Sequence, residues 1–236
     1  MFFDPMYFVF TLPALFFAMW AQYKVRSTFK RFSEVPNMQR VSGMDVARTL
    51  MQNEQLEFLQ VNQVPGDLSD FYNPADKSIN LSQTSTGAPS VAAMAVVAHE
   101  LGHALQDRDG YVWMRMRGAI VGVANIGSSI GPWIFFAGML MGGVARQGSL
   151  GWNIAFVGLL LFVGAVFFTL ATLPVELNAS KRAREMLMRN GLVSQEEMAG
   201  VSQMLNAAAL TYVAGAASAI ATMLYYVFIL FGGRRN

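Results

Sequence analysis

The only two histidines in the chain stand four residues apart, at positions 99 and 103 of the segment H-E-L-G-H. Residues i and i+4 share one face of a helix, so the imidazoles of His99 and His103 can bind one metal ion. The carboxylate of Glu100 can then reach a water molecule beside that metal and act as a general base. This spacing is typical of zinc-dependent proteases and predicts a Zn²⁺ site with both histidines as ligands.

The residues around this pair favour a buried helix. The stretch from Val91 to Gln106 is rich in Ala, Val and Met, contains no proline and follows Ser90, a suitable N-cap. Gly102 lacks a side chain inside the motif, which lets another backbone approach closely. A buried ionisable cluster needs a partner, and a metal ion provides one. A helix with two incidental histidines is the plain alternative.

A catalytic zinc site takes three protein ligands and a water molecule. The chain has no other histidine and no cysteine, so the third ligand has to be Asp or Glu. Glu176 is favoured because it directly follows a long apolar run, where a carboxylate is costly unless it is paired or bound to metal. An ion pair with Lys181 or Arg182 is the alternative for Glu176. Asp107 and Asp109 are rival ligands.

The composition is that of a membrane protein. Apolar residues make up 54% of the chain and charged residues only 14%, against about a quarter charged in an ordinary soluble domain. The charges leave four long uncharged runs, each able to supply a span of about 20 residues. We therefore predict a mainly α integral membrane protein with four transmembrane helices, at about residues 6–22, 119–144, 151–173 and 208–231.

The distribution of Lys and Arg predicts the orientation of these spans. The first apolar run has basic residues after it and none before it, as in a retained anchor rather than a cleaved signal peptide. Segments 24–117 and 175–206 contain ten and four Lys and Arg, and the opposite side has only Arg146, Arg234 and Arg235. We therefore expect both polar segments in the cytoplasm.

These assignments divide the chain into five segments. A transmembrane anchor precedes a cytoplasmic metallopeptidase segment with the histidine helix. A transmembrane hairpin, a cytoplasmic segment with the third zinc ligand and a C-terminal transmembrane helix follow. In chain order the segments are 1–23, 24–117, 118–174, 175–206 and 207–236.

The first cytoplasmic segment is predicted to form a small α+β, zincin-like portion. Residues 24–41 form a basic linker, and Ser42 begins an S-x-x-D helix cap. The alternating residues 56–64 indicate a strand, and 70–72 and 78–81 indicate a pair of strands around a turn. One strand could bind an extended peptide beside the metal, or the strands could simply cover the helix.

The chain resembles the YugP-type membrane zinc metallopeptidases, a bacterial family. The resemblance implies a gluzincin-like zinc peptidase of the bacterial plasma membrane, with His99, His103 and Glu176 as ligands and Glu100 as base. The matching stretches span most of the chain and are Tyr72–Ser82, Ala98–Ala104, Ala124–Ser128 and Leu173–Ser180.

The chain is also similar, more distantly, to the HtpX and Ste24-like membrane proteases, which place a membrane hairpin between the histidine helix and a glutamate ligand. Those families usually carry E-x-x-x-D, in which the Asp steadies a ligand histidine. Here Ser180 stands at the position of that Asp. Asp107, Asn178 and Ser180 are therefore the candidates for supporting a ligand histidine.

The predicted activity is hydrolysis of peptide bonds in membrane or membrane-proximal proteins and peptides, at a site close to the lipid bilayer. An oxyanion would need a stabilising group besides the metal, and the candidates are Tyr72, Tyr212, Arg182 and Arg184. The alternative is a metal-binding membrane scaffold or regulator without turnover, which would have no need of Glu100 as a base.

Two further classes of protein have little support. A transporter or channel would need ionisable residues inside the spans, and the four predicted spans contain essentially none. The net charge is only +2 and no basic stripe with interleaved aromatic residues occurs, so no nucleic-acid partner is expected. The sequence defines no oligomeric state.

Overall fold

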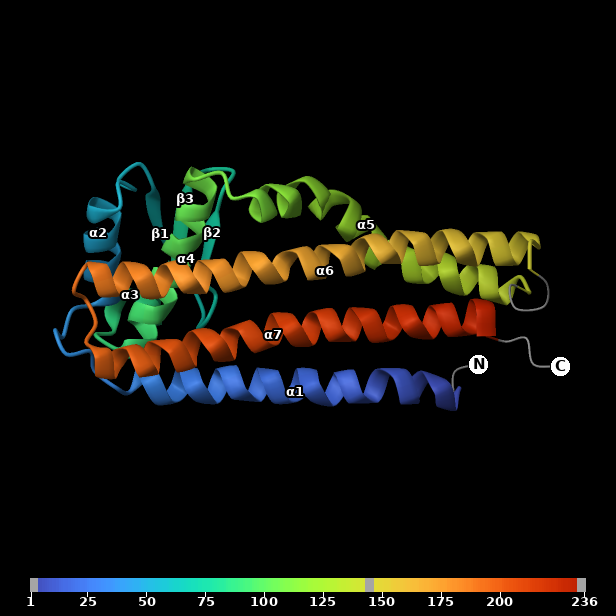
Figure 1. The fold of residues 1–236 in the computed structure, drawn as a ribbon, viewed down its shortest axis with the longest axis horizontal. Coiled ribbons are helices and arrows are strands. Elements are labelled where there is room, and N and C mark those ends of the chain that lie inside the picture. The colour runs from blue at the N-terminus through green and yellow to red at the C-terminus, as the bar shows by residue number, and fades with distance from the viewer. Residues whose placement is uncertain (1–3, 143–146, 233–236) are drawn as a thin grey trace. The chain divides into compact units, whose positions relative to one another are not determined.

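The computed structural model describes residues 4–142 and 147–232, which are mainly helical with one small sheet (Figure 1). The helices are α1 (Pro5–Ser33), α2 (Gly43–Asn53), α3 (Gln83–Gly87), α4 (Val91–Arg108), α5 (Val112–Leu140), α6 (Leu150–Arg189), α7 (Gln195–Val227) and the short π-helix η1 (Phe228–Gly232). The strands are β1 (Gln60–Val64), β2 (Phe71–Asn73) and β3 (Ser78–Ser82).

Four helices are long and apolar enough to cross a membrane, judged by length and composition: α1, α5, α6, and α7 together with η1. Three of the four predicted spans lie wholly within one of these helices, and the predicted span 119–144 coincides with α5 as far as Leu140. The helices extend beyond the apolar runs, and α1 continues to Ser33. The predicted linker 24–41 is therefore mostly helix, because no Gly or Pro lies between Lys24 and Pro36.

Three basic residues used for the predicted orientation lie outside the described residues, namely Arg146, Arg234 and Arg235. The last residues of the predicted span 119–144 lie outside them as well.

The contacts divide the chain into two compact units. One unit, here called the apolar unit, consists of the described parts of residues 1–20, 116–173 and 212–236. The other, here called the polar unit, consists of residues 21–115 and 174–211. Each unit is described by itself below.

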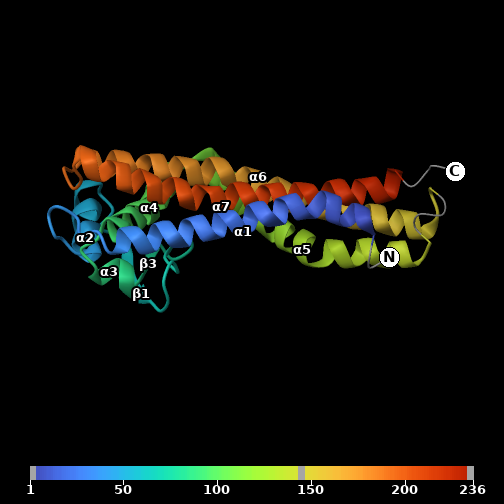
Figure 2. The ribbon, with the colours of Figure 1, turned by 90° about the horizontal axis from the view of Figure 1, so that it is seen from below.

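In the apolar unit, α5 and α6 form a hairpin with closely packed backbones, and both views show these parts of the two helices side by side (Figures 1 and 2). A Cβ atom added to Gly138 would lie 2.3 Å from the backbone nitrogen of Ala155, and one on Gly158 would lie 2.4 Å from that of Phe135. Small residues at such contacts are typical of helix pairs in membranes. Large apolar side chains remain on the outside, as with Trp133, which is 75% exposed. Such a surface suits lipid rather than water.

In the polar unit, the sheet has the strand order β1-β3-β2. The predicted antiparallel pair around the turn is confirmed, with Tyr72 of β2 opposite Ile79 of β3. Strand β1 pairs with β3 in parallel, which the sequence did not predict. Strand β2 is thus an edge strand, and α4 contacts both β2 and β3.

Helix α4 is the centre of the polar unit. Its start is capped as predicted, because the side chain of Ser90 accepts a hydrogen bond from the backbone of Ala93. The predicted cap of α2 is confirmed too, as a reciprocal pair between Ser42 and Asp45. Fully buried side chains from α2, β3, α4 and α6 form the core around α4, among them Leu50, Leu81, Met94, Leu101 and Met186.

The end of α2 is attached to the end of α6 by a buried carboxylate. Glu54, only 8% exposed, accepts hydrogen bonds from Arg189 and Asn190, and its own backbone carbonyl accepts one from Arg108. Burial alone would raise the pKa of Glu54, but these donors outweigh it and hold that pKa below its usual value. The charged carboxylate therefore links the end of α2 to the end of α6, and the backbone carbonyl of the same residue adds a link to α4.

We predict that Glu54→Gln lowers the free energy of unfolding of the purified protein in detergent by about 1–3 kcal/mol, since Arg189 loses its charged partner but remains half exposed. Chemical denaturation followed by far-UV circular dichroism measures the change. Glu57→Gln is the matched control, because Glu57 is exposed on the loop after α2. If the two substitutions lower the free energy of unfolding equally, the carboxylate of Glu54 does not stabilise the contact between α2 and α6.

Candidate metal centre

Helices α4 and α6 bring His99, His103 and Glu176 together. The Nε2 atoms of His99 and His103 lie 3.2 Å and 3.4 Å from the Oε2 atom of Glu176. One ligand atom from each of the three residues lies within 4.8 Å of the others, an arrangement that could hold a metal ion. The side chains are 12%, 10% and 4% exposed, so the cluster is almost closed to solvent.

The short distance between Glu176 and the two histidines depends on a close backbone contact at Gly102. A Cβ atom added to Gly102 would lie 2.6 Å from the carbonyl oxygen of Ala179 on α6, much closer than real Cβ contacts. The predicted role of Gly102 in admitting another backbone is thus confirmed. Because Ala179 is one helical turn from Glu176, the contact determines how near the carboxylate lies to the histidines.

A buried glutamine fixes the orientation of His103. The Nε2 atom of Gln106 donates to the carbonyl of Val175 at 2.7 Å and to Oδ1 of Asn178 at 3.0 Å. The Oε1 atom of Gln106 therefore faces His103, whose Nδ1 atom lies 3.0 Å away and donates to it. The proton of the neutral imidazole is then on Nδ1, and the Nε2 lone pair points toward Glu176.

His99 is held in the same sense by Ser180. The hydroxyl of Ser180 lies 3.3 Å from Nδ1 of His99, which leaves Nε2 of that ring facing the carboxylate. Ser180 stands at the position where the more distant sequence resemblance predicts Asp, and its hydroxyl can pair with Nδ1 of His99 without adding a charge. Of the three predicted supporting residues, Ser180 contacts a histidine directly and Asn178 acts one step away through Gln106.

The three ligand atoms fit a zinc ion. Two imidazole lone pairs and a carboxylate oxygen converge in a buried space, and such a set of acceptors is unfavourable unless positive charge lies among them. Zinc binds these ligand types at about 2.0–2.2 Å in a tetrahedron, whose edges are then about 3.3–3.6 Å. The two measured N–O separations, 3.2 Å and 3.4 Å, are close to that value.

The pKa of His103 also indicates that the buried cluster favours a positive charge. Burial disfavours the charged imidazole, but the hydrogen bond and charge of Glu176 outweigh burial and raise the pKa of His103 above its usual value.

The carboxylate of Glu100 lies beside the cluster and is held by the edge strand β2. Its Oε2 atom accepts a hydrogen bond from the backbone N–H of Tyr72 at 2.9 Å. Burial raises the pKa of Glu100, and the nearby negative charges of Glu176 and Asp70 add to that rise, while the two histidines oppose it. A buried carboxyl with a raised pKa is a stronger base than an exposed one, which suits proton transfer near neutral pH.

Other predicted residues lie in different surroundings. The carboxylate of Asp107 accepts hydrogen bonds from the hydroxyl of Tyr72 and from Lys77, both at 2.5 Å, and within the described parts of the chain no hydrogen bond joins it to either histidine. Gln106, one residue earlier on α4, makes the contact that was assigned to Asp107. The rival ligand Asp109 pairs with Arg108 and Arg182.

The structure also shows the surroundings of the four candidates for oxyanion stabilisation. The hydroxyl of Tyr72 is held by Asp107, Arg182 donates to Asp109, and Arg184 donates to Asn206 at 3.4 Å. Tyr212 belongs to the apolar unit. In the polar unit, each of these side chains is therefore already engaged with another partner.

Comparison with known proteins defines the class of this chain. Residues 7–231 match the model of the family described as "Putative neutral zinc metallopeptidase", and the chain belongs to that family. A relative from Bacillus subtilis (strain 168), named "Putative membrane protease YugP", is 38% identical over 230 residues, which cover 97% of this chain and 99% of the relative. No solved structure matches the chain. The resemblance drawn from the sequence is thereby confirmed, and the family name implies zinc.

We predict that Gly102→Ala lowers the zinc affinity of the purified protein at least tenfold, because the new methyl group forces α6 away from α4 and carries Glu176 with it. Elemental analysis after dialysis against a competing chelator measures the loss. Gly87→Ala is the control, since no atom lies within 4 Å of a Cβ at that position. Unchanged zinc retention in Gly102→Ala would show that the backbone contact does not determine the site.

We predict that Gln106→Leu lowers zinc affinity by about 10–100-fold, as is typical when the partner of a ligand histidine is removed. The leucine matches the glutamine in size but cannot accept the proton of His103, so the ring loses its fixed orientation. Asp107→Leu, one residue further along α4, is the matched control and should bind zinc like the wild type. If Asp107→Leu weakens zinc binding more than Gln106→Leu does, then Asp107 and not Gln106 supports the histidine.

Proposed function

We propose that this protein is a membrane-embedded, zinc-dependent endopeptidase, with His99, His103 and Glu176 as metal ligands and Glu100 as general base. The observation that carries the proposal is the convergence of two imidazoles and a carboxylate, with a second, basic carboxylate beside them. Membership of the zinc metallopeptidase family and the likeness to a protein named a membrane protease support it.

The residues of the chain divide the chemical work. A zinc ion, when bound, supplies a Lewis acid toward the peptide carbonyl and lowers the pKa of a water molecule at the site. Glu100 accepts a proton from the attacking water and delivers it to the nitrogen of the leaving amine. The N–H group of Tyr72 orients the carboxylate of Glu100 for this transfer. Gln106 keeps His103 in the tautomer that leaves Nε2 free, and the hydroxyl of Ser180 positions the ring of His99 through its Nδ1 atom.

We further propose that the substrates are membrane proteins or peptides close to the membrane. Glu176 follows the predicted span 151–173 by three residues of the same helix, which corresponds to about 5 Å along the helix axis. A site so near the end of an apolar run would act on peptide bonds at the bilayer surface. Soluble, unanchored proteins would reach it less readily.

The proposed location is the cytoplasmic face of a bacterial plasma membrane. Fourteen of the seventeen Lys and Arg residues belong to segments 24–117 and 175–206. An excess of basic residues in short loops favours the cytoplasmic side. These two segments are the proposed cytoplasmic, zincin-like portion, and segments 1–23, 118–174 and 207–236 are the proposed membrane portions.

Zinc content and peptidase activity of two variants test the proposed roles. We expect Glu176→Ala to lose zinc and activity together, because one of three protein ligands is gone. Glu100→Gln should keep wild-type zinc content and lose activity by about 10²–10⁴-fold, the usual contribution of a general base. The measurements are elemental analysis in detergent and cleavage of a membrane-anchored reporter peptide.

Glu185→Ala is the control for the proposed ligand, since Glu185 is an exposed residue of the same helix that forms a surface ion pair with Lys181 at 3.7 Å. Full zinc content in Glu176→Ala would refute Glu176 as an essential ligand. Activity in Glu100→Gln at wild-type zinc content would refute Glu100 as the base. Zinc binding without any turnover in the wild type would favour the scaffold function instead.

A further inference from the structure

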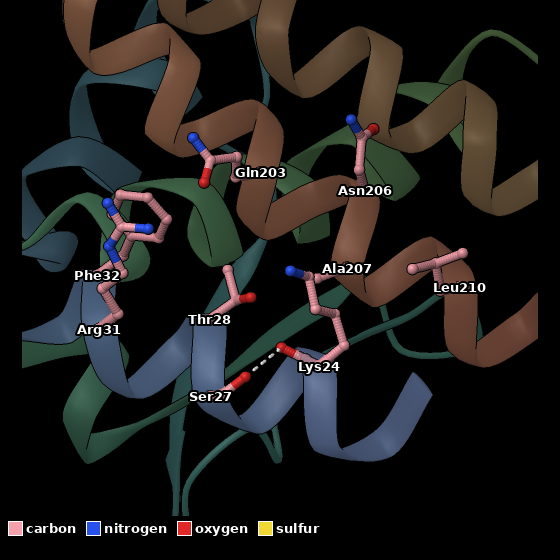
Figure 3. Close-up of a pocket in the computed structure, with 9 residues that line it drawn as sticks. All are labelled: Lys24, Ser27, Thr28, Arg31, Phe32, Gln203, Asn206, Ala207 and Leu210. Atoms are coloured by element: carbon pink, nitrogen blue, oxygen red, sulfur yellow. Dashed lines mark hydrogen bonds between the residues drawn. The ribbon is translucent and has the colours of Figure 1, made fainter. Parts of the chain in front are cut away.

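A cavity lies in the polar unit, between α1 and α7 (Figure 3). Its volume is about 330 Å³, which lies in the range of small-ligand pockets, about 300–1,000 Å³. The α1 side carries Lys24, Ser27, Thr28, Arg31 and Phe32, and the α7 side carries Gln203, Asn206, Ala207 and Leu210. Neither the three proposed metal ligands nor Glu100 contributes to it.

The cavity is positively charged. Lys24 and Arg31 lie seven residues apart on one face of α1, about 10 Å along the helix axis. Figure 3 shows the side chain of Lys24 extending from α1 toward α7. The guanidinium of Arg31 lies over the ring of Phe32, 5.1 Å from its centroid, which restrains it beside the cavity. Among the described residues that line the cavity, none is acidic.

Neutral donors stand between the two cations. Thr28 is only 8% exposed, and its hydroxyl has no hydrogen-bond partner within residues 4–142 and 147–232. As a residue that lines the cavity, Thr28 can donate its hydroxyl proton to a ligand or a water molecule there. Asn206 accepts a hydrogen bond from Arg184 of α6, which brings a third cation to the rim. Such a set of cations and hydroxyl or amide donors matches the oxygen atoms of a phosphate.

The position along α1 indicates where that phosphate comes from. The uncharged run of α1 ends at Tyr23, so Lys24 is the first cation after the predicted membrane span. Leu210 and Ala207 give the α7 side of the cavity an apolar portion. Basic pockets between helices at the cytoplasmic end of their spans are typical sites for anionic lipid head groups.

We propose that this cavity binds the phosphate head group of an anionic phospholipid. Lys24 and Arg31 bind the phosphate oxygens, and Thr28 donates a hydrogen bond to one of them. The site is separate from the metal centre, and the proposal does not depend on peptidase activity.

Titration of the full-length protein in uncharged detergent tests the proposal, with calorimetry as the readout. The probes are dioctanoyl phosphatidylglycerol, dioctanoyl phosphatidylcholine and inorganic phosphate. We expect saturable binding of the phosphatidylglycerol, at least tenfold tighter than that of either other probe. The double variant Lys24→Gln/Arg31→Gln should bind it at least tenfold more weakly, since each basic residue near an anionic lipid contributes to affinity.

The double variant Arg26→Gln/Lys30→Gln is the matched control. It removes the same charge from exposed positions of α1 that do not line the cavity, and its affinity should stay within threefold of the wild type. Thr28→Val keeps the shape of the side chain and should weaken binding at least threefold, which tests the site without changing its charge. Zinc content confirms that each variant is folded.

Three outcomes overturn the proposal. Equal losses in the two double variants would mean attraction by general surface charge. Equal affinity for phosphatidylglycerol and phosphatidylcholine would mean that no anionic head group is recognised. Inorganic phosphate binding as tightly as phosphatidylglycerol would make the cavity a site for free anions.

Discussion

The close contact between α4 and α6 at Gly102 is the constraint on which the rest of the polar unit depends. It brings the carboxylate of Glu176 within hydrogen-bond distance of both histidines, and it also lets Gln106 reach the backbone of α6. Because Gln106 takes the Nδ1 proton of His103 and Ser180 pairs with Nδ1 of His99, the Nε2 atoms of both rings face the carboxylate in a buried space. The packing of α4 against α6 thus creates a buried site in which a cation is electrostatically favourable.

Much of this arrangement could be predicted because it follows from residue types. With two histidines and no cysteine, the ligands had to be both imidazoles and a carboxylate, and only Glu176 directly followed an apolar run. The spans were evident from four uncharged runs. The β2–β3 pair followed from the turn residues between two short apolar stretches, and the helix caps at Ser42 and Ser90 from their positions.

The features that were missed depend on contacts between distant segments. Residues three and four positions beyond a histidine are both its neighbours on a helix, so the sequence alone could not choose between Gln106 and Asp107. The hydrogen bond from Gln106 to the carbonyl of Val175 on α6 orients Gln106 toward His103. The hydrogen bond from the backbone of Tyr72 to Glu100 has no side-chain signal at all. The parallel pairing of β1 with β3 lacks a connecting turn, and nothing local marked it.

The proposed ligands are also separated along the chain in a way that bears on biosynthesis. Both histidines belong to α4, whereas Glu176 comes only after α5 and most of α6, two of the helices able to cross a membrane. A nascent chain that ends within α5 therefore carries two imidazoles and the proposed base but not the third proposed ligand. Synthesis of the hairpin has to precede assembly of the proposed centre, so an unfinished chain would lack the proposed peptidase activity toward the proteins around it.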